Sequence, residues 1–182
     1  MISDNQIACG CRNGSINIWN LDNSKKVKTF KAHTDWIPCL LLVDNSKLIS
    51  CSADKKIKIL NLDTFECTRV LEGHSDIVYY LELTSDGNLF SCSGDKTVKL
   101  WELETGKELQ SIDFDHYVYC VKILVKDLVV VGLQNDEIRI YDLCKRETVK
   151  TIKSYASRFH LLSNGNLLSA CREGVIKLWD IL

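Results

Sequence analysis

The sequence predicts an all-β protein made of about five repeated units, each with four short antiparallel strands. The first support is a segment that recurs about every forty residues, with an aromatic or apolar anchor at positions 19, 60, 101, 141 and 179. A second landmark repeats with nearly the same spacing, at Ile37, Val78, Val118 and Ala156. The third support is an apolar period of two, without the sustained 3.6-residue period of an amphipathic helix.

The four strands are clearest in the unit that ends at position 103. In order along the chain they are Thr68–Leu71, Val78–Leu83, Asn88–Ser93 and Val98–Trp101. Gly94 and Asp95 begin the turn between the last two strands, and both residue types suit tight turns. A lone four-stranded sheet buries little apolar surface, so we expect each unit to pack against its neighbours.

The same pattern divides the whole chain into one repeat region, residues 1–182. The expected units cover about residues 1–21, 22–62, 63–103, 104–143 and 144–182. The chain enters at the second strand of a unit and ends on the third strand of another, which gives about four and a half repeats and about 18 strands.

Composition and charge exclude several classes of protein. Of 182 residues, 46% are hydrophobic, and the net charge is -1, which is enough for a packed core and argues against general disorder. The balanced charge weighs against a nucleic-acid binder. There is no apolar stretch of membrane-spanning length and no basic, apolar leader, so neither a membrane partner nor export is expected.

The nine cysteines are best read as reduced thiols in a cytoplasmic or nuclear protein. Their number is odd and no export signal accompanies them. A zinc site would need two closely spaced pairs, and only Cys9 and Cys11 are close in sequence. We therefore expect no metal site and no cofactor.

Four residues of the unit ending at position 103 give the repeat a known resemblance. With Gly73 before it, His74 is followed by Ser91, Asp95 and the pair Trp101-Glu102, and this order resembles the WD-repeat β-propeller family. The resemblance implies that His74, Ser91, Asp95 and Trp101 form a structural hydrogen-bonded tetrad. In it the aspartate accepts from the histidine and from turn amides, and the hydroxyl links the histidine to the indole.

The other units keep only part of this set. Retained members are Trp19 in the first unit, His33, Ser50 and Asp54 in the second, and Ser169 and Trp179 in the fifth. Leu60 replaces the tryptophan of the second unit. The fourth unit has Phe114, Val131, Asn135 and Tyr141 at the four positions, so His116 is expected in a loop.

The repeat count leaves the closure of a ring open. Propellers have 4 to 8 blades, and WD-repeat proteins most often have seven. The first unit lacks its innermost strand and the last lacks its outermost, and these two halves do not complete one blade. We expect an incomplete ring or arc that belongs to a larger propeller. The alternatives are a self-associating half-propeller and an irregular small ring.

Catalytic motifs are absent from the sequence. It contains no GxSxG, no HExxH and no glycine-rich phosphate loop. Asp54 and Asp95 lie in equivalent turns of successive units, where each is expected to hold its own turn. No catalytic residue is assigned, and the chain is not expected to be an enzyme.

Candidate binding residues follow from the resemblance, because WD-repeat proteins often bind partners across the top face of the ring. Three positions in each unit line that face: the two that flank the start of the innermost strand, and the one before the turn aspartate. The candidates are Arg12, Trp36, Tyr79, Tyr117, Tyr119, Gln134, Tyr155 and Arg172. Aromatic residues and arginine are enriched at interaction hot spots. The alternative is that several of these tyrosines only pack between units.

The leading functional hypothesis is therefore a non-catalytic protein-interaction scaffold, whose partner is a peptide or protein with acidic or phosphorylated character. A substrate-receptor subunit of a ubiquitin ligase is one alternative. A metal-dependent hydrolase and a truncated, non-functional fragment are the others.

Overall fold

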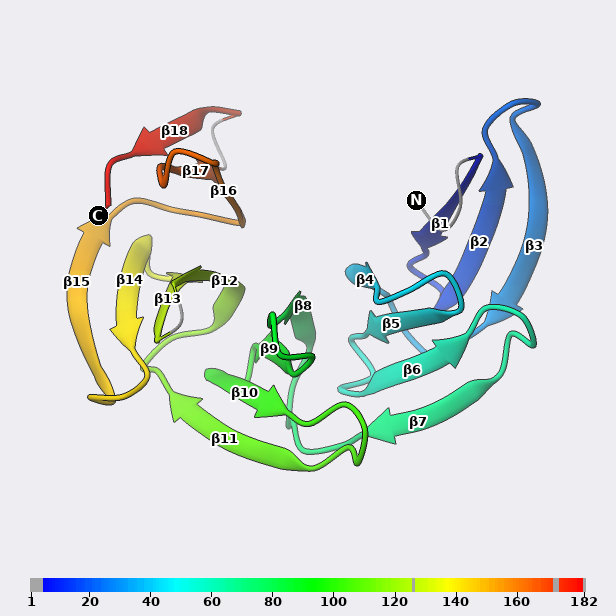
Figure 1. The fold of residues 1–182 in the computed structure, drawn as a ribbon, viewed down its shortest axis with the longest axis horizontal. Helices are drawn as coiled ribbons and strands as arrows, with labels where there is room; N and C mark the ends of the chain where they lie inside the picture. Colours follow the sequence, from blue (N-terminus) through cyan, green and yellow to red (C-terminus); the bar gives the residue numbers. More distant parts are fainter. Residues whose placement is uncertain (1–4, 126, 172–173, 182) are drawn as a thin grey trace.

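Five antiparallel sheets follow one another along the chain and stand side by side in an unclosed ring (Figure 1). This computed structural model describes residues 5–125, 127–171 and 174–181. Eighteen strands occur in that part of the chain. None of the described residues belongs to a helix long and apolar enough to cross a bilayer. The predicted all-β class and incomplete ring of antiparallel sheets are confirmed.

The middle three sheets have four strands each, and the two end sheets have three. The first sheet contains β1 (Gln6–Gly10), β2 (Ser15–Asn20) and β3 (Lys25–Lys31). The second contains β4 (Cys39–Leu42), β5 (Lys47–Cys51), β6 (Ile57–Asn61) and β7 (Cys67–Leu71). The third contains β8 (Val78–Leu83), β9 (Leu89–Ser93), β10 (Thr97–Trp101) and β11 (Glu108–Asp113). The fourth contains β12 (Val118–Val125), β13 (Leu128–Leu133), β14 (Glu137–Asp142) and β15 (Glu147–Lys153). The fifth contains β16 (Arg158–Leu161), β17 (Leu167–Ala170) and β18 (Ile176–Trp179).

Each sheet is a meander in which strands consecutive in sequence pair with each other. The strands β4, β8, β12 and β16 lie toward the centre of the ring, and β3, β7, β11 and β15 form its outer edge (Figure 1). An outer strand is followed directly by the inner strand of the next sheet. Each sequence repeat therefore begins in one sheet and continues in the next.

A tight turn joins the second and third strands of each four-stranded sheet. The same turn joins β1 to β2 and β17 to β18, and it recurs with the spacing of the sequence repeat. In every sheet one residue of this turn has a positive φ, between 58° and 79°. These residues are Gly14, Lys55, Lys96, Asp136 and Gly174. Left-handed backbone is costly for a residue with a side chain, so the turn must be held by its neighbours. At Lys55 the Asp54 carboxylate does so, because its Oδ1 accepts from the amide of Lys56 at 3.1 Å.

The hydrophobic core lies between sheets rather than inside any one of them. Four clusters of buried residues occupy the four junctions of neighbouring sheets. At the junction of the second and third sheets, Ile49 and Leu71 pack with Val78 and Trp101. Because each of the three middle sheets has a neighbour on either side, removing one of them would expose the apolar faces of both neighbours.

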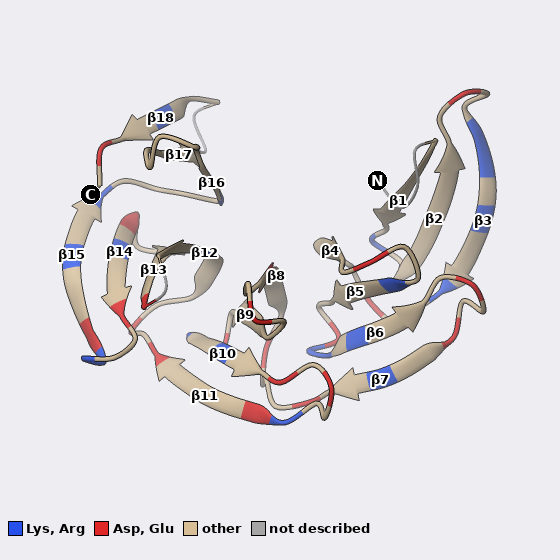
Figure 2. Ribbon diagram, in the orientation of Figure 1, with Lys and Arg blue, Asp and Glu red and all other residues tan. Residues whose placement is uncertain are grey.

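Charged residues occur on the outer strands of the ring and at its turns. Lysines follow one another along β3, and further basic residues lie on β15, while acidic residues gather at many of the turns (Figure 2). An outer strand has a row of unpaired backbone groups, and lysine at such an edge discourages pairing with another chain. This accounts for the lysine content of β3 without a ligand.

Candidate partner-binding face

The third sheet contains a complete set of linked polar side chains. His74 Nδ1 lies 2.7 Å from Asp95 Oδ2, and His74 Nε2 lies 2.7 Å from Ser91 Oγ. The Trp101 indole donates to the same Ser91 oxygen at 2.8 Å. When the proton of His74 is on Nδ1, every donor in this network has an acceptor. The Nδ1–H group donates to the Asp95 carboxylate, the Ser91 hydroxyl donates to His74 Nε2, and the Trp101 indole donates to the Ser91 oxygen. Full satisfaction is what makes such a buried network stabilising.

Asp95 also anchors the loop and the turn on either side of it. Its carboxylate accepts from the amides of Ser75 at 2.9 Å and Thr97 at 3.0 Å. Burial by itself would raise the pKa of Asp95, but the hydrogen bond and charge of His74 and the bonds from Thr97 and Ser75 outweigh it. The net pKa lies well below the ordinary aspartate value, so Asp95 remains a carboxylate.

The second sheet keeps three of the four members. His33 Nδ1 lies 2.8 Å from Asp54 Oδ2, and His33 Nε2 lies 2.8 Å from Ser50 Oγ. Leu60 stands at the tryptophan position, so Ser50 receives no indole donor there. Burial lowers the pKa of His33 in spite of the opposing effect of Asp54, which favours a neutral ring.

The first and fifth sheets keep fewer members of the polar tetrad. In the fifth sheet the Trp179 indole donates to Ser169 Oγ at 2.9 Å, which repeats the Trp101–Ser91 contact. In the first sheet Trp19 lies on β2 opposite Ile7. Its counterpart of Ser91 is Cys9, so a hydroxyl acceptor for the indole is missing.

In the fourth sheet, two aromatic residues take the histidine and tryptophan positions of the tetrad. Phe114 and Tyr141 meet edge to face with centroids 5.8 Å apart, close to the 6.0 Å that separates His74 and Trp101. Asn135 takes the aspartate position, and its side-chain oxygen is buried without a hydrogen-bond partner among the described residues. His116 lies in the loop between β11 and β12, as predicted.

Four of the candidate binding residues meet in one cavity on the top face, the face that carries the turns of Asp54 and Asp95. This aromatic cavity has a volume of about 210 Å³. Its lining residues are Trp36, Pro38, Tyr79, Tyr119, Tyr155, Ser157 and Arg158. They come from the starts of the inner strands of the second to fifth sheets, so only the assembled ring brings them together.

The tyrosines of the aromatic cavity form a row. The ring centroids of Tyr79 and Tyr119 are 5.3 Å apart, and those of Tyr119 and Tyr155 are 5.9 Å apart. Contacts at these distances and tilts are favourable for aromatic pairs. The tyrosines thus pack on one another, and they also line an open cavity.

Local irregularities explain why Tyr79 and Tyr119 reach this face. The register of β8 against β9 shifts between Val78 and Tyr80, and that of β12 against β13 shifts between Val118 and Cys120. Such a bulge removes one residue from the ladder and redirects its side chain. Tyr79 and Tyr119 are the residues left out of the strand pairing at these two bulges. Burial raises the pKa of Tyr79, and Tyr119 and Asp76 add to the effect.

Arg158 is a cavity residue that the sequence did not identify. Its guanidinium lies over the Tyr80 ring, 4.8 Å from the centroid, and donates to the Ser157 carbonyl at 2.7 Å. No described carboxylate forms an ion pair with it. The sequence repeat could have identified it. Arg158 takes the position in its inner strand that Cys39, Tyr80 and Cys120 take in the other inner strands.

The remaining candidates lie apart from the aromatic cavity. Arg12 lines a neighbouring hollow of about 240 Å³ with Asp35 and Trp36. Tyr117 and Gln134 do not line the aromatic cavity, although the Gln134 amide donates to the Tyr117 carbonyl at 3.0 Å. Arg172 lies outside the described residues. Of the candidate binding residues, only Trp36, Tyr79, Tyr119 and Tyr155 line the aromatic cavity among the described residues.

Neither a cluster of metal ligands nor a disulfide is found in the described part of the chain. It contains no group of three or more His, Cys, Asp or Glu residues placed to hold an ion. None of the nine cysteines, all of which are described, is in a disulfide.

Comparisons with known proteins agree with this architecture. The sequence model of the family "WD domain, G-beta repeat" matches residues 24–61 and 65–102. A p21-activated protein kinase-interacting protein 1-like from Danio rerio is 29% identical over 77 residues, which is 39% of this chain and 21% of the relative. The crystal structure of the WD40 β-propeller domain of Doa1 superposes with a TM-score of 0.82 at 23% identity, over 97% of this chain and 60% of that one.

The chain thus spans only part of the length of the proteins it resembles. Two of its repeats match the WD-repeat family model, and the chain has the fold of a WD40 β-propeller.

Proposed function

We propose that this chain is a non-catalytic protein-interaction scaffold, and that the aromatic cavity binds an acidic or phosphorylated side chain of a peptide or protein partner. WD-repeat propellers generally serve as interaction scaffolds. A relative named for its interaction with a p21-activated protein kinase is consistent with that role.

The observation that carries the proposal is the position of Arg158. It is half-buried, it lines the aromatic cavity, and it has no carboxylate partner among the described residues. A guanidinium binds a carboxylate or phosphate through paired hydrogen bonds. An anionic side chain entering the cavity would supply the partner that Arg158 lacks.

The tyrosine row supports the proposal by giving the partner an apolar wall. Tyr79, Tyr119 and Tyr155 are held by ring contacts and by the bulges of β8 and β12, so little side-chain freedom is lost on binding. Rigid aromatic surface of this kind is typical of interaction hot spots. Trp36 extends the wall toward the hollow that contains Arg12.

Two carboxylates on the same face are turned partly to the backbone. Asp35 Oδ1 accepts from the Trp36 amide at 2.6 Å, and Asp76 Oδ1 accepts from the Ile77 amide at 2.7 Å. These contacts offset part of their charge. Among the described residues, the aromatic cavity itself is lined by Arg158 and by no carboxylate.

Peptide libraries with one fixed central residue test the proposal. The probes are fluorescein-labelled libraries centred on phosphothreonine, glutamate, threonine or lysine, and binding to the full chain is measured by fluorescence polarisation. We expect the phosphothreonine and glutamate libraries to bind more tightly than the threonine and lysine libraries. Equal binding of all four would refute the proposal.

Variants then locate the bound peptides. Arg158→Met should weaken anionic binding about tenfold or more, while Arg158→Lys should retain part of it, because a lysine keeps the charge but not the paired geometry. Lys150→Met on the outer strand β15 is the matched control and should bind normally. Undiminished binding by a folded Arg158→Met variant would exclude the aromatic cavity.

A further inference from the structure

Two cavities lie on the bottom face, at the opposite ends of the strands from the aromatic cavity. One, of about 730 Å³, lies between the second and third sheets, and the other, of about 630 Å³, lies between the third and fourth. The turn between β8 and β9 separates them, and its residues Asp86 and Asn88 line both. We call the two cavities together the bottom groove.

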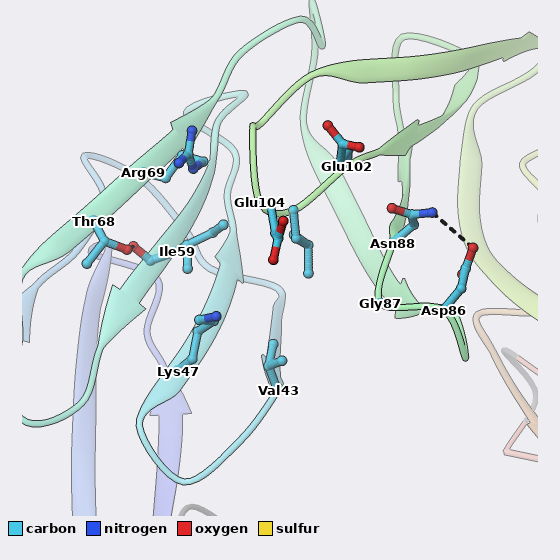
Figure 3. A pocket seen from close by; sticks show the side chains of 11 residues that line it. Val43, Lys47, Ile59, Thr68, Arg69, Asp86, Gly87, Asn88, Glu102 and Glu104 are labelled. Carbon is cyan, nitrogen blue, oxygen red and sulfur yellow. Dashed lines mark hydrogen bonds between the residues drawn. The ribbon is translucent and has the colours of Figure 1, made fainter.

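The larger cavity has an apolar part, a basic wall and an acidic wall. Lys47 and Arg69 lie on the wall from the second sheet, and Asp86 and Glu102 lie across from them (Figure 3). Arg69 is already engaged, because its Nη1 donates to the Thr105 carbonyl at 2.6 Å. The apolar part is made by Val43, Ile59 and Leu103.

Carboxylates dominate the side of this cavity that belongs to the third sheet. Glu104 lies near the middle of the opening in Figure 3, and no hydrogen bond or ion pair is assigned to it among the described residues. Asp86 accepts from Asn88 Nδ2 at 3.1 Å, which orients its carboxylate at the wall shared by the two cavities.

The smaller cavity is mainly apolar. Its apolar lining consists of Phe90, Leu100, Ile123, Val125 and Leu143, and Asp86 and Asp127 stand at its rim. Val125 is 46% exposed although it ends an inner strand otherwise rich in buried side chains. An apolar hollow bordered by carboxylates suits an apolar side chain with a cation beside it.

We propose that the bottom groove binds an extended segment of a partner protein in which a lysine or arginine lies between two apolar side chains. One apolar side chain fills the smaller cavity against Val125, and the other packs on Val43 in the larger one. The cation between them meets Asp86 on the shared wall. Four carboxylates line the groove against the two cations Lys47 and Arg69, so the net charge disfavours a nucleic acid as the occupant.

A random dodecapeptide library displayed on phage, selected against the immobilised full chain, is the first test. We expect the enriched sequences to carry lysine or arginine between apolar positions. Enrichment of acidic sequences, or no enrichment above a blank surface, overturns the proposal.

The most enriched sequence, made as a fluorescein-labelled peptide, then tests the location by fluorescence polarisation. Val125→Lys and Glu104→Lys should each weaken its binding about tenfold, because they place positive charge in the groove, and added salt should weaken the wild-type binding. The controls are Val27→Lys and Glu147→Lys on the outer edge.

Circular dichroism establishes that each variant is folded before its binding is measured. A peptide that binds folded Val125→Lys as tightly as wild type, but is lost from Tyr119→Ala, binds the aromatic cavity, and that outcome also overturns the bottom groove. The test is independent of the function proposed for the top face, because no described residue lines both sites.

Discussion

Phe114 and Tyr141 meet edge to face in the fourth sheet, at the places that His74 and Trp101 occupy in the third. The ring contact is thus common to the third and fourth sheets. Of these two sheets, only the third also has the hydrogen bonds to serine and aspartate. The edge-to-face contact between the loop residue before the inner strand and the ring at the tryptophan position, rather than the polar tetrad, is therefore the feature that these two sheets share.

Replacing Trp101 should be among the most damaging single changes. Trp101 is 1% exposed and packs at the junction of the second and third sheets. Trp101→Ala should lower the free energy of unfolding by about 3–5 kcal/mol, the usual cost for a buried aromatic side chain. Urea denaturation followed by circular dichroism measures it. A loss below 1 kcal/mol would contradict the burial assigned to this ring.

Tyr141 provides the matched comparison in the fourth sheet. Its hydroxyl has no hydrogen bond among the described residues, and its ring supplies the contact with Phe114. Tyr141→Phe should therefore change stability by less than about 0.5 kcal/mol. Trp101→Phe should cost about 1–3 kcal/mol, because it leaves the Ser91 oxygen without its donor. Equal losses in the two variants would show that the indole hydrogen bond contributes nothing.

Leu60→Trp should destabilise the protein although it restores the fourth tetrad residue to the second sheet. The gain is one hydrogen bond to Ser50, worth about 0.5–1.5 kcal/mol. Leu60 is 1% exposed and packs with Ile16, Ile37 and Leu48, so a larger ring must displace these neighbours at about 1–3 kcal/mol. A higher melting temperature than wild type would show that the junction adapts more easily than this.

Acid should weaken the fourth sheet through Glu137. Hydrogen bonds from Lys153 and then Arg139 lower the pKa of Glu137 to about 2, against about 4.3 in an unfolded chain. Between these values the unfolded state binds more protons, so the contribution is complete above about pH 4.3 and is lost as the pH falls toward 2. Lys153 is largely exposed, which limits the effect to about 1 kcal/mol.

Glu137→Gln removes this titration. Unfolding free energies at pH 5 and pH 3 should therefore differ less in Glu137→Gln than in wild type. Glu147→Gln, at the exposed start of β15, should behave like wild type. An unchanged pH dependence in Glu137→Gln would contradict the assignment.

Thiol reactivity should divide the cysteines by burial. Cys67 and Cys144 are exposed, whereas Cys51, Cys92 and Cys120 are fully buried. Burial raises the pKa of Cys120 to about 12 and also raises those of Cys51 and Cys92, so these three form little reactive thiolate. In timed iodoacetamide labelling with peptide mass spectrometry, Cys67 and Cys144 should be modified first. Early labelling of Cys92 would contradict the packing between the third and fourth sheets.

The sequence by itself determined the repeat, the strands and the tetrad positions. A period of two shows which residues face a neighbouring sheet, and Val78–Leu83 was predicted with the bounds that the structure has for β8. His74, Ser91, Asp95 and Trp101 could be matched one by one because each lies at a fixed place in a repeat of nearly constant length.

Only the tertiary structure decided which top-face residues share a cavity. Tyr79 and Tyr119 reach it through strand bulges that no period of two contains, and Arg158 joins them from a fifth sheet about forty residues further along the chain. Tyr117 and Gln134 stay outside it despite their matching register. A repeat fixes where a residue lies within its own sheet, but a cavity between sheets depends on how several sheets pack, and that is set by contacts far apart in sequence.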